Sequence, residues 1–545
     1  MMNVLKKIFI TGILLVSCGW LFAQFPFFRL NQTELKSELD KLNHATANIA
    51  ILYVDTVKVS QLVEDAITGI LEKLDPHSVY IPKDEVKKMN EPLEGSFEGI
   101  GIEFQMLEDT LFVVQTRSGG PSEKVGILAG DRIIAVNDTS IAGVKIQNSE
   151  IQKKLRGKKG TEVNVRVLRR GVSELIDFKI IRDKIPIYSL DAAYMVDENI
   201  GYIRLNCFSA TTYDEYKTAF AKLKKAGMKS LILDLQRNSG GYMNAATDLA
   251  NEFLDQGKLI VYSEGLNQPR IPVFAKNKGD FTSGDLLVLV DEASASSSEI
   301  VAGAIQDWDR GIIVGRRTFG KGLVQRPVEL LDGSLIRLTV ARYYTPSGRS
   351  IQKPYKGKKY SYSDFNDKFT DEFIERYNDH TLIHEDSLLF PDSLRYYTQV
   401  LKRTVYGGGG IMPDYYVPFD TTVITPYLRK IVAKGIVSKI ALQYVDKEKK
   451  KLQKEYPVFA KYKANFEIGK DLEEKLIAEA EKEGISFVEE EYEKSKPFLL
   501  LQIKAIIARD MWETSEFYQI MNDRNESYKK AVEILKAEAT KFTIY

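Results

Sequence analysis

Short apolar runs alternate with helical runs through the middle of the chain, and this alternation limits the possible folds more than any other feature of the sequence. Three short runs have apolar centres: "KSLILDL", "LLVLVDE" and "GIIVGRR". Strands of this kind are usually buried on both faces, as in parallel sheets. The intervening runs "AATDLANEFL" and "SSEIVAGAIQDW" are helical in pattern. The alternation therefore predicts a mainly parallel α/β core.

The chain has 545 residues, which is enough for several domains. Apart from the first residues, we expect a helical region, a small β-rich domain, the α/β core, and a charged helical domain at the C-terminus. These occupy residues 31–95, 96–184, 185–425 and 426–545. Residues 355–405 are charged, rich in tyrosine and poor in strand pattern, so we interpret them as an insertion in the core.

The N-terminus, "MMNVLKKIFITGILLVSCGWLFAQF", places two lysines before an apolar run that is short for a membrane span. This is typical of an export signal. We favour a signal peptide over residues 1–23, cut after Ala23, because the apolar stretch continues past Cys18. Lipoprotein processing at Cys18 and an uncleaved anchor are the alternatives. All three predict export to the bacterial cell envelope, with the body in the periplasm and possible membrane association through the N-terminus.

Charge and cysteine content exclude some classes of function. The 76 basic and 75 acidic residues nearly cancel, so the sequence lacks the basic excess of a nucleic-acid-binding protein. Processing would leave Cys207 as the last cysteine, which excludes an internal disulfide. We interpret Cys207 as a small buried residue, with a thiol nucleophile as the alternative.

The segment "LVDEASASSSEIVAGAI" crowds four serines into the turn between a predicted strand and a predicted helix. A serine hydroxyl needs a base before it can act as a nucleophile. The chain has four histidines, at His44, His77, His380 and His384, and none lies in the predicted core strands. There is also no G-x-S-x-G motif, so a Ser-His-Asp site is not favoured.

A lysine that burial keeps neutral can replace histidine as the base. Lys321 in "GRRTFGKGLVQ" lies between two glycines, and Gln325 could orient its amine. Gly240 and Gly241 in "LILDLQRNSGGYMNAA" come before a predicted helix, where backbone amides can stabilise an oxyanion. An exposed lysine and an ordinary loop are the alternatives.

Several long segments, in this order, resemble the C-terminal processing peptidases, also called tail-specific proteases. "DLQRNSGG", "SASSSEIVAGAIQDWDRGIIVG" and "TFGKGLVQ" resemble the active-site segments of that family. "YYTPSGRSIQ", "GIMPDYYV" and the N-terminal "LDPHSVYIP" resemble further family segments, and residues 98–182 resemble a PDZ domain. The fold implied is a multi-domain α/β fold with a crotonase-like β-β-α protease core, an N-terminal helical region, a PDZ domain and a C-terminal helical domain.

The resemblance implies roles for individual residues. Ser296 matches the nucleophile, Lys321 the general base, and Gln325 the partner that orients it. Asp307 matches an acidic position of structural importance. The oxyanion donors would be the amides of Gly240 or Gly241 and of Ser297, although Ser297 stands where many members carry alanine.

Two further motifs concern ligands. "GIGIEF" resembles the carboxylate-binding loop of PDZ domains, at Gly99, Ile100, Gly101 and Ile102, and "AGDRIIAVND" supports this reading. His380 and His384 have a metal-ligand spacing, but they lie in a charged stretch and we expect them to be solvated. We therefore expect neither a metal nor another cofactor.

The sequence thus predicts an exported serine endopeptidase that binds protein or peptide substrates by their C-termini and cuts them by a Ser-Lys mechanism. A catalytically silent PDZ scaffold is the alternative from another class, and a hydrolase or lyase of small acyl compounds is a third. The oligomeric state stays open.

Overall fold

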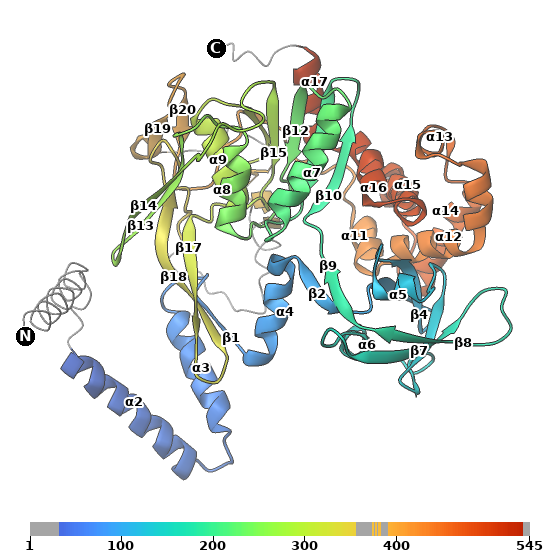
Figure 1. Ribbon diagram of the computed structural model, residues 1–545, viewed down its shortest axis with the longest axis horizontal. Helices are drawn as coiled ribbons and strands as arrows, with labels where there is room; N and C mark the ends of the chain where they lie inside the picture. Colours follow the sequence, from blue (N-terminus) through green and yellow to red (C-terminus); the bar gives the residue numbers. More distant parts are fainter. Residues whose placement is uncertain (1–31, 356–372, 375, 379, 383–390, 538–545) are drawn as a thin grey trace, which may run out of the picture.

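The computed structural model describes residues 32–355, 373–374, 376–378, 380–382 and 391–537 (Figure 1). The expected signal peptide, with Cys18 and Ala23, lies outside these ranges. Within them, no helix combines the length and the apolar character that crossing a bilayer requires.

A six-stranded sheet forms the centre of the core, in the order β10-β11-β12-β15-β16-β21. All neighbours are parallel except β10, which pairs antiparallel with β11 at one edge. The strands are β10 (Leu190–Met195), β11 (Ile200–Leu205), β12 (Ser230–Asp234), β15 (Leu286–Val290), β16 (Ile312–Gly315) and β21 (Tyr415–Tyr416). This is the mainly parallel arrangement that the alternating pattern predicts.

Helices cover both faces of this sheet, and the strand period of two decides which residues each face receives. Leu231 and Leu233 of β12 pack in the cluster that includes α7 (Thr212–Lys225), α8 (Met243–Asn251) and α9 (Ser297–Asp307). Ile232 points to the other face and packs with residues of α17 (Glu526–Lys536). The last helix among the described residues is therefore a layer of the core (Figure 1).

A second sheet connects the N-terminal region to the core. Its order is β1-β18-β13-β14, with β17 paired to β18. The strands are β1 (Val79–Ile81), β13 (Leu259–Gly265), β14 (Gln268–Phe274), β17 (Leu323–Glu329) and β18 (Leu335–Tyr344). Because β1 lies between two helices of the N-terminal region, α3 and α4, that region supplies a strand to the protease core.

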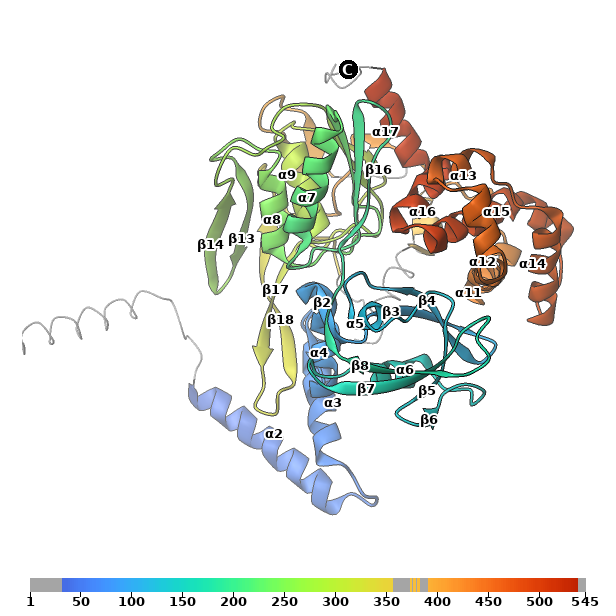
Figure 2. The same ribbon diagram turned by 45° about the vertical axis from the view of Figure 1, so that its right-hand side comes forward.

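The N-terminal helices are α2 (Gln32–Leu52), α3 (Val59–Leu71) and α4 (Lys83–Glu94). Helix α2 extends away from the rest of the molecule in both views (Figure 1, Figure 2) and has no buried residue. Its exposed apolar side chains include Leu35, Leu39 and Leu42.

The β-rich domain enters and leaves through two paired strands, β2 (Ser96–Gly99) and β9 (Asp183–Pro186). Between them lies a sheet of order β3-β4-β5-β7-β8, with β6 beside β5. Its elements are β3 (Ile102–Leu107), β4 (Thr110–Thr116), α5 (Pro121–Lys124), β5 (Arg132–Val136), β6 (Thr139–Ser140), α6 (Asn148–Leu155), β7 (Glu162–Leu168) and β8 (Ile176–Ile181). Strand β3 lies at the edge of this sheet.

The C-terminal helices form a further cluster with its own buried apolar core. They are α11 (Pro426–Ala433), α12 (Ile436–Glu455), α13 (Phe459–Asn465), α14 (Lys470–Lys482), α15 (Glu489–Met511) and α16 (Thr514–Met521). Helix α16 packs on β10, and α12 contacts the β-rich domain through Leu442. The charged helical domain expected at the C-terminus is therefore packed against two other parts of the molecule.

The expected insertion contains one short hairpin, β19 (Arg395–Tyr397) and β20 (Thr404–Tyr406), preceded by the 3₁₀ turn Asp392–Leu394. It also contains a helical stretch at residues 376–378. The remaining residues of the expected insertion lie largely outside the described ranges.

Candidate active site

Ser296 occupies the turn between the buried strand β15 and helix α9. Its backbone has φ 53° and ψ −109°, a conformation that L-residues rarely adopt. Backbone strain of this kind costs on the order of 1–3 kcal/mol and is concentrated at functional sites. Its side chain is half-buried, so the hydroxyl lies at the boundary between the core and solvent.

The other serines of this turn are used for structure. Ser294 Oγ donates to the Leu235 carbonyl (2.8 Å), Ser297 Oγ to the Gly241 carbonyl (3.0 Å) and Ser298 Oγ to the Asn238 carbonyl (2.8 Å). These three bonds join the Ser296 turn to the glycine-rich turn after β12. The Ser296 hydroxyl donates to no acceptor among the described residues, which distinguishes it from its neighbours.

The carboxylate of Glu299 joins the Ser296 turn to the Lys321 segment. Its Oε2 accepts from the amides of Ser296 (2.8 Å) and Lys321 (2.9 Å). Its Oε1 accepts from Thr318 Oγ1 (2.6 Å) and the Gly320 amide (2.7 Å). Burial raises the pKa of Glu299, and the four donors oppose this shift because they favour the ionised form.

The hydroxyl of Tyr343 joins the same two residues through their carbonyl groups. Tyr343 Oη lies 3.0 Å from the Ser296 carbonyl oxygen and 2.6 Å from that of Lys321. Burial raises the pKa of Tyr343 well above its ordinary value, so the phenol keeps its proton and remains a donor. One carboxylate and one phenol therefore hold Ser296 and Lys321 close together, at the amide and at the carbonyl of each.

Gln325 lies on β17, where a register shift against β18 interrupts the ladder. Its Nε2 donates to the backbone carbonyl of His77. This contact fixes the orientation of the side-chain amide and leaves its carbonyl oxygen as an acceptor. The His77 turn is itself held by Asp75 Oδ1, which accepts from the His77 amide (2.8 Å) and from Thr339 Oγ1 of β18 (3.1 Å).

The glycine-rich turn lies directly against the Ser296 turn. A Cβ added to Gly240, whose φ is +99°, would lie 2.8 Å from the Ser296 Cβ. The Gly240 amide already donates to Asn238 Oδ1 (2.9 Å). The amides of Gly241 and Ser297 donate to no acceptor in the described part of the chain. Of the three expected oxyanion donors, the geometry therefore favours Gly241 and Ser297 over Gly240.

Asp307 lies at the C-terminal end of α9 and is fully buried. It forms an ion pair with Arg349 (2.8 Å), whose side chain is also fully buried, and Asp307 Oδ2 accepts from the Ser347 amide (2.8 Å). These contacts anchor the turn after β18.

The expected carboxylate-binding loop connects β2 to the edge strand β3. Gly101 has φ +75°, which favours glycine. The Ile100 side chain is buried, and its carbonyl accepts from the Ser122 amide (3.0 Å) and hydroxyl (2.7 Å). The loop is therefore fixed by the domain core beside Gly99 and Ile102, next to the open edge of β3.

The remaining candidate residues lie apart from these contacts. Burial raises the pKa of the Cys207 thiol to about 11, as for an inert cysteine. His380 is exposed, and His384 lies outside the described residues. The residues that the structure describes contain no group of three or more histidines, cysteines or carboxylates placed to hold a metal.

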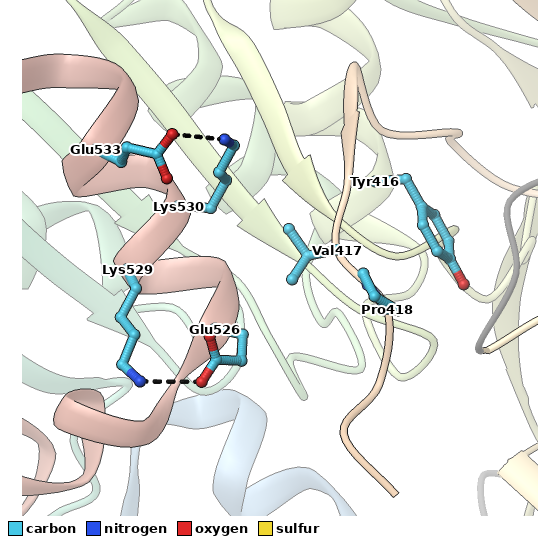
Figure 3. Close-up of a pocket in the computed structure, with 7 residues that line it drawn as sticks. All are labelled: Tyr416, Val417, Pro418, Glu526, Lys529, Lys530 and Glu533. Carbon is cyan, nitrogen blue, oxygen red and sulfur yellow. Dashed lines mark hydrogen bonds and ion pairs between the residues drawn. The ribbon is translucent and has the colours of Figure 1, made fainter. Parts of the chain in front are cut away.

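A pocket lies between the segment after β21 and helix α17 (Figure 3). Its charged residues pair with one another: Lys529 with Glu526 (2.9 Å) and Lys530 with Glu533 (2.7 Å). None of the candidate catalytic residues lines this pocket.

Sequence reasoning missed the structural partners of the candidate site. Glu299 stands three residues after Ser296, the S-x-x-E spacing of a capping box, which could have revealed it. Tyr343 is part of the quoted "YYTPSGRSIQ" segment, but a single tyrosine in a strand carries no signal of its own. The contact between His77 and Gln325 joins residues 248 apart in the sequence, so local pattern could not predict it.

Four stretches of the chain match protein-family models. Residues 199–358 match peptidase family S41, residues 99–180 match a PDZ domain, and residues 28–85 match the N-terminal domain of the activating protease CtpB. Residues 427–513 match a family of unknown function.

Two similar proteins are carboxy-terminal processing proteases. The carboxy-terminal processing protease CtpA of Bacillus subtilis is 38% identical over 318 residues, which cover 58% of this chain and 67% of the relative. The carboxy-terminal-processing protease of Bartonella bacilliformis is 36% identical over 327 residues, which cover 59% and 74%. The solved PDZ domain of the carboxy-terminal protease from Vibrio cholerae, in complex with peptide, is 30% identical, with 17% of this chain and 99% of that domain covered and a TM-score of 0.16. The chain thus belongs to the C-terminal processing peptidase family, and it is a serine-type endopeptidase with a PDZ domain.

Proposed function

We propose that Ser296 is the nucleophile of this peptidase and Lys321 its general base. One observation carries the assignment: Glu299 and Tyr343, both buried, bind the backbones of Ser296 and Lys321 together. A nucleophile and its base need a fixed separation, and the hydrogen bonds that Glu299 and Tyr343 make to both residues supply it. The neighbouring serines are poorer candidates because their hydroxyls donate to backbone carbonyls.

In the proposed reaction, Ser296 Oγ attacks the scissile carbonyl carbon while its proton passes to the neutral amine of Lys321. The amides of Gly241 and Ser297 donate to the oxyanion that forms. The C–N bond then breaks, and Lys321 gives the proton to the leaving amine. Water, deprotonated by Lys321, hydrolyses the acyl-enzyme. Gln325 orients the amine through its side-chain carbonyl oxygen.

Substrates would be bound by their C-termini at the PDZ domain. Strand β3 lies at an open sheet edge, so a peptide can add to it as a further strand. The loop from Gly99 to Ile102 would then receive the terminal carboxylate at backbone amides.

The test is hydrolysis of unfolded substrates that differ only at the C-terminus. Ser296→Ala and Lys321→Ala are each expected to lower kcat/KM by several orders of magnitude in a folded protein. Ser298→Ala is the matched control and should keep most of the activity. Amidation of the substrate C-terminus should weaken binding. An active Ser296→Ala variant would overturn the nucleophile assignment, and equal rates for free and amidated substrates would overturn C-terminal recognition.

The proposed setting is the bacterial cell envelope, on the basis of the N-terminal sequence. Cell fractionation of the full chain should find the mature body outside the cytoplasm. Replacing Cys18 by serine separates the two processing routes: if Cys18 carries a lipid, mass spectrometry finds that lipid in the wild type and not in the variant, and if cleavage follows Ala23, the mature protein is unchanged. The exposed apolar face of α2 supports self-association as a further proposal, which light scattering of the purified protein would test.

A further inference from the structure

Arg376 belongs to the expected insertion, and its side chain reaches the segment that carries Lys321. The residue is 3% exposed. Its Nη1 donates to the Arg317 carbonyl (2.6 Å) and its Nη2 to the Thr318 carbonyl (2.9 Å), with the Phe319 carbonyl at 3.5 Å. One guanidinium thus donates hydrogen bonds to the backbone carbonyls of consecutive residues, just before the candidate base Lys321.

These carbonyls lie in a stretch of irregular backbone between β16 and β17. Thr318 and Phe319 are buried, so their carbonyls need donors that a sheet ladder does not supply here. Glu299 binds the same stretch through donors, at Thr318 Oγ1 and at the amides of Gly320 and Lys321. A cation therefore holds the carbonyls of the segment, and a carboxylate holds its amides and hydroxyl.

The turn that carries Arg376 is attached to the protease core. The Arg376 carbonyl accepts from the Leu382 amide (3.2 Å). The Leu382 carbonyl accepts from the Phe419 amide (2.9 Å), and the Thr381 carbonyl accepts from Tyr416 Oη (2.9 Å). Arg376 is therefore supported by the strand β21 and the residues after it, which fixes the position of its guanidinium.

We infer that Arg376 is a positioning residue for Lys321, and that the helical stretch at residues 376–378 supports the candidate site through this side chain. The inference rests on the proposed role of Lys321. An arginine suits the position because its planar fork offers five donors in fixed directions, whereas a lysine ammonium is a compact charge without that geometry. Loss of the guanidinium would remove the donor to the buried Thr318 carbonyl and allow the segment before Lys321 to shift.

The test is steady-state kinetics of Arg376→Ala on a peptide substrate. We expect kcat to fall by about 10- to 100-fold, as for a lost charge-assisted contact, and KM to change by less than about twofold. Arg376→Lys should lose less, and millimolar guanidinium chloride should restore part of the activity of Arg376→Ala, with sodium chloride as the salt control. If Arg376→Ala does not fold, Arg376→Lys and Arg376→Gln give the same comparison.

Arg403→Ala is the matched control. Arg403 is a largely buried arginine near the end of the same segment, and it binds Asp309 (2.8 Å), just after the C-terminal end of α9, and Asp414. The Arg403→Ala substitution should lower Tm but leave kcat within about twofold of wild type. Equal losses of kcat in both variants, a change confined to KM, or an unchanged kcat in Arg376→Ala would each overturn the inference. An active Lys321→Ala enzyme would instead overturn the proposed mechanism.

Discussion

At the residue scale, the serines around the start of α9 are chemically alike but make different contacts, and single substitutions can distinguish their roles. Ser297→Ala removes the hydroxyl that donates to the Gly241 carbonyl, which should cost about 1 kcal/mol of stability. The Ser297 amide, the proposed oxyanion donor, stays in place. We therefore expect kcat within about tenfold of wild type. A loss as large as that of Ser296→Ala would show that Ser297 takes part in the chemistry.

Cys207 offers a second residue-scale prediction, on pH. Its thiol pKa is raised to about 11, so the reactive thiolate forms only in alkaline solution. Compared with a free thiol, alkylation at pH 8 should be about 100-fold slower and should rise about tenfold per pH unit until the pKa is reached. Mass spectrometry of the Cys18→Ser protein with iodoacetamide measures this, and the urea-unfolded protein is the reference. Fast labelling of the folded protein would contradict the burial of this thiol.

The candidate catalytic residues could be named from sequence because each stands in a short motif. The residues that hold these catalytic residues in place could not be named from the sequence. Glu299 and Tyr343 act by joining segments that are distant in sequence, and Arg376 lies in a stretch without a recognisable pattern. The choice between Gly240 and Gly241 also needed coordinates, because the Asn238 side chain that occupies one amide is visible only in the folded turn.

At the scale of the elements, β18 carries the tyrosine that joins the two halves of the candidate site. Tyr343→Phe removes the hydroxyl and keeps the ring, so the packing of this buried residue is preserved. We expect a fall in kcat of about 10-fold with little change in KM, and a loss of about 1–3 kcal/mol in unfolding free energy. Tyr344→Phe, one residue on and stacked on Tyr262, is the matched control. If both variants behave alike, the hydroxyl of Tyr343 does not position the site.

The sequence predicted the buried strands and the helices between them well, because apolar period and turn residues are local signals. It did not predict that β1 joins the second sheet or that α17 covers the first. Both contacts join segments that are far apart in the sequence. They depend on which apolar faces remain uncovered when the chain folds. The charged appearance of the C-terminal helices also hid a core of their own, since each helix buries only one face.

At the scale of the whole molecule, the C-terminal helices connect the PDZ domain to the protease core. On one side, Leu442 of α12 packs on Phe112 and Val114 of β4. On the other, Asn525 Nδ2 donates to Gln236 Oε1 (2.7 Å), beside the glycine-rich turn. The PDZ domain is therefore held in one position by the helical domain as well as by the β2–β9 pair.

The junction at Leu442 can be weakened without touching the catalytic residues. Leu442→Ala should cost about 2–5 kcal/mol and should increase hydrogen exchange in β4 and α12. Asp446→Ala removes the partly exposed pair with Arg132 (3.0 Å) and should cost less than about 1 kcal/mol. Hydrogen exchange measured by mass spectrometry compares the two. Equal protection in Leu442→Ala and wild type would mean that this contact does not hold the PDZ domain.

The pairing of an early strand with late ones has a consequence for biosynthesis. The contact from His77 to Gln325 spans 248 residues, and α17, the last described helix, covers the central sheet. Contacts of such separation form slowly and only after the distant partner has been synthesised. A growing chain therefore has its candidate nucleophile long before it has a working site. We therefore expect a nascent chain to remain inactive until β17 and α17 have been synthesised and have packed against their early partners.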